Sequence, residues 1–114
     1  MDKSEREGFV RAVYEVVGKI PSGRATSYGA IAKAIGYPRF SRLVGKVLQE
    51  NGQTEKVIPF HRVVNSKGFL SGKESFGNEN QMAYLLEEEG VTVENDSIRD
   101  WKTIFWDPLQ EIEI

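Results

Sequence analysis

The chain has 114 residues, no cysteine and one histidine, and its formal net charge is −2 at pH 7. The lack of cysteine excludes disulfides, a thiolate nucleophile and cysteine-ligated metals, and a single histidine excludes a multi-histidine metal centre. No apolar run approaches the ~18 residues that a membrane span needs, and the N-terminus lacks a signal-peptide pattern, so we expect a cytoplasmic protein without membrane contact. The length suits one domain over residues 1–114.

The charges are distributed unevenly along the chain. Residues 19–73 carry ten basic and two acidic side chains, a balance of +8, whereas residues 74–114 carry two basic and eleven acidic ones, a balance of −9. This separation indicates one face for a polyanion and another face that repels it. The alternative is that the two sets pair with each other over a mixed surface.

The first predicted element is a helix that begins near Ser4, where Ser4 and Glu7 form a capping box. Apolar residues recur at helical spacing along it and would pack one face on the core. They are Phe9, Val10, Val13, Val16, Val17 and Ile20. The Ile-Pro-Ser-Gly segment 20–23 then ends the helix.

Two shorter helices follow across a tight turn. Ser27 caps the first, over residues 28–35, Gly36 ends it, and Pro38 opens the second. The second helix has apolar inward positions, Phe40, Leu43, Val44, Val47 and Leu48, and a mainly polar or basic outward face, Arg39, Ser41, Arg42, Gly45, Lys46 and Gln49. This pattern predicts a helix-turn-helix, although any helical hairpin shares it. Gly45 leaves the outward face flat, which lets the backbone approach a partner.

The segment 58–65, Ile-Pro-Phe-His-Arg-Val-Val-Asn, is a rigid loop that leads into a strand. Asn65 begins a turn, and residues 63–64 and 69–70 across that turn predict a small hairpin that acts as a wing. The alternative is a buried loop in which His61 is a satisfied core histidine.

The rest of the chain contains one more predicted helix and an aromatic tail. Asn80 or Asn78 caps the helix, which runs through Met82 and Leu86 to Gly90. The tail aromatics Trp101, Phe105 and Trp106, with Pro108, are expected to close a core, because their acidic neighbours disfavour nucleic acid.

Together, these segments resemble the DNA-binding domain of the O6-alkylguanine-DNA alkyltransferases, over roughly residues 8–93. That family has a cysteine between the proline and the histidine of the 58–65 segment, and Phe60 stands there instead. A phenyl ring has no lone pair to accept an alkyl group, so the chain resembles the alkyltransferase-like branch, which lacks the cysteine. Tryptophan is common at this place in that branch, and Phe60 departs from it. The sequence begins where the family's DNA-binding domain begins, so we expect no extra N-terminal domain.

The resemblance implies a mainly α fold with a small β element, a winged helix-turn-helix-like domain whose second helix enters the minor groove. It implies that Arg42 fills the base stack in place of an extruded guanine, and that Tyr28 helps to turn the target phosphate. The alternatives are a solvated helix charge for Arg42 and a packing role for Tyr28. The DNA-binding residues predicted in this way are Tyr28, Arg39, Ser41, Arg42, Gly45, Lys46 and Asn51.

The resemblance also implies a lesion pocket with Phe60 as its floor. The predicted pocket residues are Tyr28, Pro59, Phe60, Arg62, Phe69, Ser71 and Gly72. Glu89 matches a buried glutamate that pairs with the motif histidine, so we expect a His61–Glu89 hydrogen bond that holds the loop and has no catalytic role. Arg62 either reaches the flipped base or forms an internal ion pair.

The leading hypothesis is therefore non-enzymatic recognition of O6-alkylguanine in double-stranded DNA, by a monomer that flips the base and signals to nucleotide excision repair proteins. No cofactor and no metal are expected. Two alternatives remain open at this point. One is a helix-turn-helix regulator that prefers a sequence in undamaged DNA. The other is an alkyltransferase with His61 as acceptor, although imidazole is much less nucleophilic than a thiolate.

Overall fold

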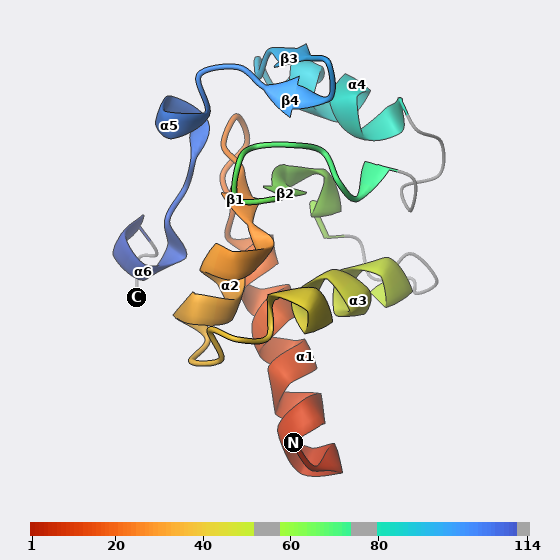
Figure 1. The fold of residues 1–114 in the computed structure, drawn as a ribbon, viewed down its shortest axis with the longest axis vertical. Helices are drawn as coiled ribbons and strands as arrows, with labels where there is room; N and C mark the ends of the chain where they lie inside the picture. Colours follow the sequence, from red (N-terminus) through yellow and green to blue (C-terminus); the bar gives the residue numbers. More distant parts are fainter. Residues whose placement is uncertain (52–57, 74–79, 112–114) are drawn as a thin grey trace.

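The computed structural model describes residues 1–51, 58–73 and 80–111 (Figure 1). Its helices are α1 (Lys3–Gly18), α2 (Tyr28–Ala34), α3 (Ser41–Asn51), α4 (Gln81–Glu88), α5 (Trp101–Ile104) and α6 (Pro108–Glu111), with a 3-10 turn, η1 (Phe60–Arg62). The short strands are β1 (Thr26–Ser27), β2 (Val63–Val64), β3 (Val93–Glu94) and β4 (Ser97–Ile98). Figure 1 shows α1, α2 and α3 in the lower half, α4 with β3 and β4 in the upper half, and β1, β2 and η1 between them. This is the predicted mainly helical fold with a small β element.

Two hydrophobic clusters hold the halves together. The larger one joins the buried faces of α1, α2 and α3 to Phe60, Val63 and Trp106. The second cluster packs beneath α4 and the β3–β4 hairpin. It contains Ala25, Val64, Leu70, Met82, Leu86, Val91 and Ile98. Because neighbouring residues Val63 and Val64 enter different clusters, the η1–β2 segment is fixed from both sides. The burial of Trp106 confirms that the tail closes a core.

The helix starts follow the side chains that can satisfy free backbone N–H groups. Ser27 Oγ accepts from Ala30 N–H at 3.1 Å, so the predicted cap of α2 is confirmed. The predicted Ser4–Glu7 capping box is wrong, because Asp2 caps α1 and accepts from Glu5 N–H at 2.8 Å. An aspartate performs the same function as a serine cap and places Ser4 inside the helix.

α3 also begins later than predicted, at Ser41 and not at Pro38. The Phe40 N–H donates to the Tyr37 carbonyl at 2.9 Å, which closes a turn around Pro38. The Phe40 ring packs edge-on against the rings of Phe9 and Tyr37, with centroids 6.3 and 5.6 Å apart. The contact with Phe9 packs the turn against α1, and the contact with Tyr37 lies within the turn. Together they fix the turn geometry, so α3 begins only at Ser41.

α4 begins after Asn80, which makes no side-chain capping hydrogen bond, and Asn78 lies outside the described residues. The chain leaves α4 through Gly90, whose φ of +89° is in the left-handed region that glycine adopts readily. The predicted C-terminal glycine of this helix is therefore confirmed.

The strand pairing differs from the predicted wing. β2 pairs in parallel with β1, with Thr26 opposite Val63 and Ser27 opposite Val64. Asn65 N–H does donate to the Phe69 carbonyl at 3.0 Å, but Leu70 N–H donates to Asp96 at 2.8 Å, and Phe69 bridges to Ser97. The expected hairpin between residues 63–64 and 69–70 is therefore wrong, because the second segment joins the β3–β4 hairpin.

The tail is bound to the segment that leads into β1. Arg24 donates from Nε to the Ile104 carbonyl at 2.9 Å and from Nη2 to the Phe105 carbonyl at 2.6 Å. The Trp106 N–H donates to the Ala25 carbonyl at 2.8 Å. These bonds fix the backbone three residues before Tyr28.

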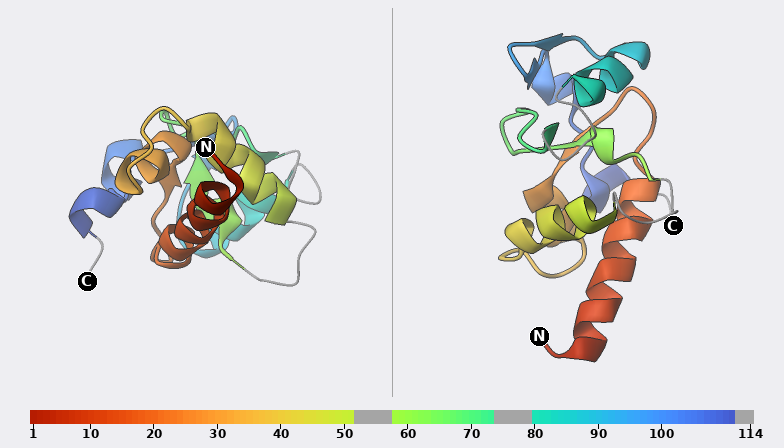
Figure 2. Two further views of the ribbon diagram at one scale, coloured as in Figure 1. Left: turned by 90° about the horizontal axis from the view of Figure 1, so that it is seen from below. Right: turned by 90° about the vertical axis from the view of Figure 1, so that its right-hand side faces the viewer.

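The molecule measures 40 × 30 × 22 Å along its principal axes, and the N-terminal end of α1 extends away from the body (Figure 2). No helix in the described ranges has the length and apolar character that crossing a membrane requires.

Candidate nucleic-acid interface

An open cleft of about 550 Å³ lies beside the outward face of α3. Its lining residues are Tyr28, Ser41, Arg42, Gly45, Lys46, Gln49, Ser71 and Gly72. The cleft therefore brings together five of the predicted DNA-binding residues and the pocket residues Ser71 and Gly72. Sequence reasoning did not select Gln49, although its spacing of seven residues from Arg42 puts both on one helix face.

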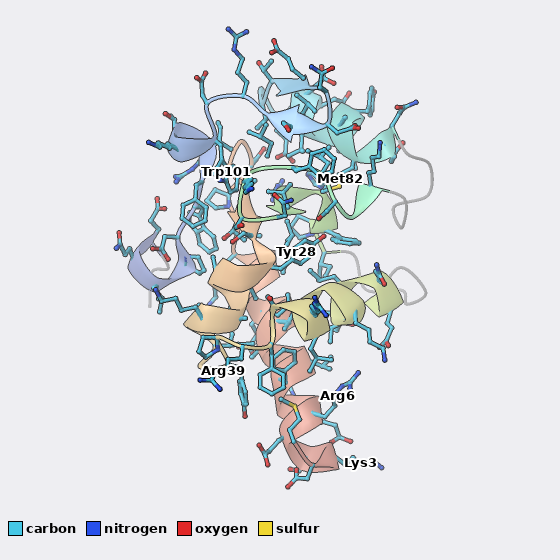
Figure 3. The ribbon with its side chains drawn as sticks, in the orientation of Figure 1. Lys3, Arg6, Tyr28, Arg39, Met82 and Trp101 are labelled. Carbon is cyan, nitrogen blue, oxygen red and sulfur yellow. The ribbon has the colours of Figure 1, made fainter. Side chains whose placement is uncertain are left out.

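Tyr28 stands at the centre of this cleft. Figure 3 shows it in the middle of the molecule, at the start of α2. Burial raises the pKa of Tyr28 above its usual 10.0, and a hydrogen bond with the Ser71 side chain opposes this shift in part. The phenol is therefore neutral at pH 7, and its hydroxyl can both donate and accept a hydrogen bond.

Two glycines border the Tyr28 side chain in different ways. A Cβ at Gly72 would lie 2.6 Å from the Tyr28 hydroxyl oxygen, which is too close for a side chain there. A Cβ at Gly45 would lie 3.6 Å from the Tyr28 ring, an ordinary van der Waals contact. A side chain at Gly72 would therefore displace Tyr28, whereas Gly45 has space for a methyl group.

Phe60 lies one layer below the cleft surface. It is only 5% exposed and starts η1 directly after Pro59. A Cβ at Gly72 would be 3.4 Å from Cζ of the Phe60 ring, so the ring is directly beneath Gly72. Tyr28, Ser71 and Gly72 line the cleft, whereas the predicted floor residue Phe60 is not part of the lining and lies beneath Gly72.

The basic residues of α3 face the cleft without acidic partners. Arg42 and Lys46 are exposed, and neither forms an ion pair with any residue in the described ranges. Arg39 is likewise exposed but does not line the cleft, and the side chain of Asn51 lies outside the description. The α3 surface is therefore a cationic wall that is available to a polyanion.

Elsewhere, basic and acidic segments do pair. Ion pairs join Arg24 to Glu111 at 3.0 Å, Arg62 to Glu89 at 2.6 Å and Lys73 to Asp96 at 2.8 Å. The alternative, that the two charge sets pair with each other, therefore holds for these three pairs and, among the described residues, not for Arg42 and Lys46.

Glu89 joins three parts of the chain behind the cleft. Its Oε2 lies 2.7 Å from His61 Nε2 and 2.6 Å from Arg62 Nη2, and its Oε1 accepts from Gly23 N–H at 3.1 Å. Arg62 also donates to the Ile20 carbonyl at 2.8 Å. The predicted His61–Glu89 hydrogen bond is confirmed. Of the two roles considered for Arg62, the structure shows the internal ion pair, and a contact with a flipped base stays a prediction.

The charge state of Glu89 follows from these contacts. Burial raises the pKa of Glu89, but hydrogen bonds from Arg62, His61 and the Gly23 N–H outweigh burial and lower this pKa from 4.5 to about 2. An ionised carboxylate only accepts hydrogen bonds, so His61 Nε2 carries the proton between them. The cluster is a clamp with no nucleophile at its centre.

Two other predicted pocket residues lie outside the cleft lining. Pro59 is partly buried in the loop before η1, and Phe69 is 39% exposed where it bridges to Ser97. Phe69 was placed in the pocket by the family resemblance, and its role there stays a prediction. Within residues 1–51, 58–73 and 80–111, no group of three His, Asp or Glu side chains is arranged to hold a metal ion.

Comparison with known proteins relates this arrangement to DNA repair. Residues 8–91 match the family model described as 6-O-methylguanine DNA methyltransferase, DNA binding domain. The chain is 36% identical over 94 residues to alkyltransferase-like protein 1 of Schizosaccharomyces pombe, covering 82% of this chain and 86% of that protein. It is 37% identical over 108 residues to the DNA base-flipping protein of Escherichia coli, covering 92% of this chain and 80% of that protein.

A solved structure gives the same relation at the level of the fold. The crystal structure of S. pombe Atl1 in complex with damaged DNA containing O6-carboxymethylguanine matches with a TM-score of 0.75 and 32% identity, covering 93% of this chain and 98% of that chain. The matched residues 8–91 include the whole cleft lining and the Glu89 clamp.

Proposed function

This chain belongs to the 6-O-methylguanine DNA methyltransferase family through its DNA-binding domain, and on this premise we propose that it binds O6-alkylguanine in double-stranded DNA and leaves the alkyl group in place. One observation carries the proposal. The residue that stands where the family's cysteine is expected, Phe60, is a buried phenyl ring directly behind the cationic cleft on α3, and the 114 residues contain no cysteine.

α3 is the element that would enter the minor groove. Its outward face combines the small residues Ser41 and Gly45 with Arg42 and Lys46, two cations that have no ion-pair partner among the described residues. Small residues let the helix backbone approach the base edges, and the cations neutralise phosphates. Arg42 would fill the stack after the damaged guanine leaves it, which offsets part of the few kcal/mol that flipping costs.

The extrahelical base would enter the cleft beside Tyr28. A Cβ at Gly72 would lie next to both the Tyr28 hydroxyl and the Phe60 ring, so a shift of Tyr28 and Gly72 would let the alkyl group reach the ring. An apolar ring suits an alkyl substituent, because the contact removes apolar surface from water. Tyr28 would then be free to hydrogen bond to the phosphate of the flipped nucleotide.

His61 is a poor alternative acceptor for the alkyl group. It is buried, and its Nε2 donates to an ionised Glu89 at 2.7 Å. In a neutral imidazole the protonated Nε2 has no free lone pair, and the remaining nitrogen, Nδ1, is a much weaker nucleophile than a thiolate. The arrangement therefore supports binding and disfavours transfer to imidazole.

A protein that holds a lesion unrepaired needs a second activity to remove it. We include nucleotide excision repair proteins in the proposal as the downstream partners, with the single chain as the DNA-bound unit.

Intact-mass measurement tests the absence of transfer. The protein is incubated with excess duplex that contains one O6-methylguanine, under conditions where a complex is seen by gel shift. We expect a complex, an unchanged protein mass and intact O6-methylguanine in the recovered DNA. A mass increase of one methylene would show that the chain is a transferase. Complexes of equal stability on a fixed unmodified sequence would instead indicate the helix-turn-helix regulator.

A further inference from the structure

Gln49 is a cleft residue to which neither the fold nor the proposed chemistry gives a role. It is exposed on the wall of the cleft, three residues after Lys46 and seven after Arg42 on the same face of α3. Its side chain forms no hydrogen bond with any other residue in the described ranges. A side chain this long, unpaired and directed to the cleft has its polar atoms available to a ligand.

The chemistry of this side chain differs from that of its neighbours. Its carboxamide has two N–H donors and an acceptor oxygen but no charge. A neutral group releases no counterion from a phosphate and so adds little to non-specific binding. Base edges in the minor groove offer both partners, since every pair has acceptors there and only guanine adds a donor, its N2 amino group.

We propose that Gln49 contacts the minor-groove edge of a base pair near the lesion and favours guanine there, through its N2 amino group. This inference rests on the proposed function, because it needs α3 in the minor groove and Arg42 at the vacated base position.

The helix geometry indicates which base pair is contacted. Seven residues rise about 10 Å along an α-helix, and successive bases are about 3.4 Å apart along a strand. If Arg42 marks the flipped nucleotide, Gln49 lies about three base pairs away, and its side chain reaches one pair further or nearer.

An inosine scan tests the contact. Inosine·cytosine pairs replace guanine·cytosine pairs one at a time, at up to four positions on each side of a single O6-methylguanine. This change deletes only the N2 amino group from the minor groove. We expect about fivefold weaker binding by the natural protein at one position, the loss of one hydrogen bond, two to four pairs from the lesion.

Variants separate this contact from a change in duplex stability. Gln49→Met keeps the side-chain length without the carboxamide, so it should lose the response to inosine at that position. Gln110→Met, on the exposed face of α6, should keep the response of the natural protein. Gln49→Lys should bind all duplexes with a steeper salt dependence and no response to inosine.

The outcomes distinguish this inference from the function on which it rests. If the protein prefers the lesion but Gln49→Met and the natural protein respond alike to every inosine, Gln49 reads no base and the inference is wrong. If the protein has no preference for the lesion, the proposed function fails irrespective of the scan.

Discussion

At the scale of single residues, the Tyr28 hydroxyl lies beside Gly72 in the lining of the cleft. Burial raises the pKa of the Tyr28 hydroxyl and a hydrogen bond with Ser71 lowers it, and Gly72 lacks the Cβ that would lie 2.6 Å from the hydroxyl oxygen. The buried ring of Phe60 lies beneath Gly72. Under the proposed function, specificity for an alkylated base would come from the displacement of this lining, and from Arg42, which would replace the base that leaves the duplex.

Arg42→Ala tests the role of this arginine in base extrusion. Removal of one cationic group from a phosphate changes the salt slope by about one unit. Loss of a stack-filling group should in addition lower the population of extrahelical base, read from a fluorescent base analogue next to the lesion. Arg39→Ala is the matched control, since Arg39 is an exposed arginine three residues before Arg42 and does not line the cleft. A change in salt slope alone in both variants would make Arg42 a phosphate-binding residue.

Phe60→Cys tests whether the site lacks only a nucleophile. His61 would stand beside the new thiol, with Glu89 to orient it, but truncation of a buried aromatic costs roughly 3 kcal/mol and leaves a cavity. A misplacement of ~1 Å can cost about 100-fold in rate. We therefore expect the variant to bind O6-methylguanine duplex and to transfer the methyl group slowly or not at all, as measured by single-turnover mass spectrometry.

Phe69→Cys provides the control for this experiment, because it places a thiol at a 39% exposed ring outside the cleft lining. Rapid alkylation of the Phe60→Cys thiol and not of the Phe69→Cys thiol would show a site that is already arranged for chemistry, contrary to our expectation.

At the scale of elements, Glu89 connects the end of α4 to η1 and to the loop after α1. Its contacts come from His61 and Arg62 on η1 and from Gly23 on the loop. Because Phe60 is also part of η1, this clamp holds the ring in place under Gly72. The His61–Glu89 pair is therefore a structural connection in this protein.

The lowered pKa of Glu89 predicts how stability depends on pH. Its pKa is about 2 in the folded state against 4.5 ordinarily, so its stabilisation is complete above about pH 4.5 and is lost as the pH falls toward 2. The loss should reach up to about 3 kcal/mol in the free energy of unfolding, measured by urea denaturation. Glu89→Gln should be less stable at pH 7, and its difference from the natural protein should shrink over that pH range. Glu111→Gln, which removes an exposed partner of Arg24, should cost less than about 1 kcal/mol.

Gly45→Ala should change protein stability and DNA affinity in opposite directions. A methyl group fits at 3.6 Å from the Tyr28 ring, and alanine favours the helix over glycine by up to about 1 kcal/mol. The variant should therefore be more stable to urea yet bind duplex DNA more weakly, because the methyl group keeps the α3 backbone away from the groove. Gly8→Ala in α1, where the methyl group meets open space, should raise stability and leave binding unchanged. Unchanged DNA affinity in Gly45→Ala would show that the α3 backbone makes no close approach.

At the scale of the whole molecule, the net charge is −2, but the α3 surface beside the cleft is cationic. The acidic C-terminal part pairs with Arg24, Arg62 and Lys73 and leaves Arg42 and Lys46 without partners in the described ranges. This selective pairing gives an overall acidic protein one surface that attracts DNA. The sequence predicted the separation of charge, and only the fold shows which cations remain available.

The sequence predicted best what local geometry decides. The Ser27 cap and the spacing of Arg42, Gly45 and Lys46 along one face depend on helix periodicity alone. The pairing of Val63 with Thr26 depends on residues far apart in the chain, and so does the packing of Phe40 on Phe9 that delays α3. Neither leaves a signal in the local pattern.

The sequence also did not show whether Arg62 contacts the pocket or an internal partner. Arg62 follows Phe60 and His61 and was a reasonable pocket residue, but folding places its guanidinium against Glu89 and the Ile20 carbonyl. Phe60 stays a prediction as the residue at the family's cysteine position, and its place beneath Gly72 depends on residues that are apart in the chain.

Lesion preference is the central claim, and a paired binding measurement tests it most directly. One duplex is prepared with guanine or with O6-methylguanine at a single position, and both are titrated with the protein by fluorescence anisotropy at the same salt concentration. We predict tighter binding to the methylated duplex, with the methyl group still on the guanine when the titration ends. Equal affinity for the two duplexes would contradict the proposed function.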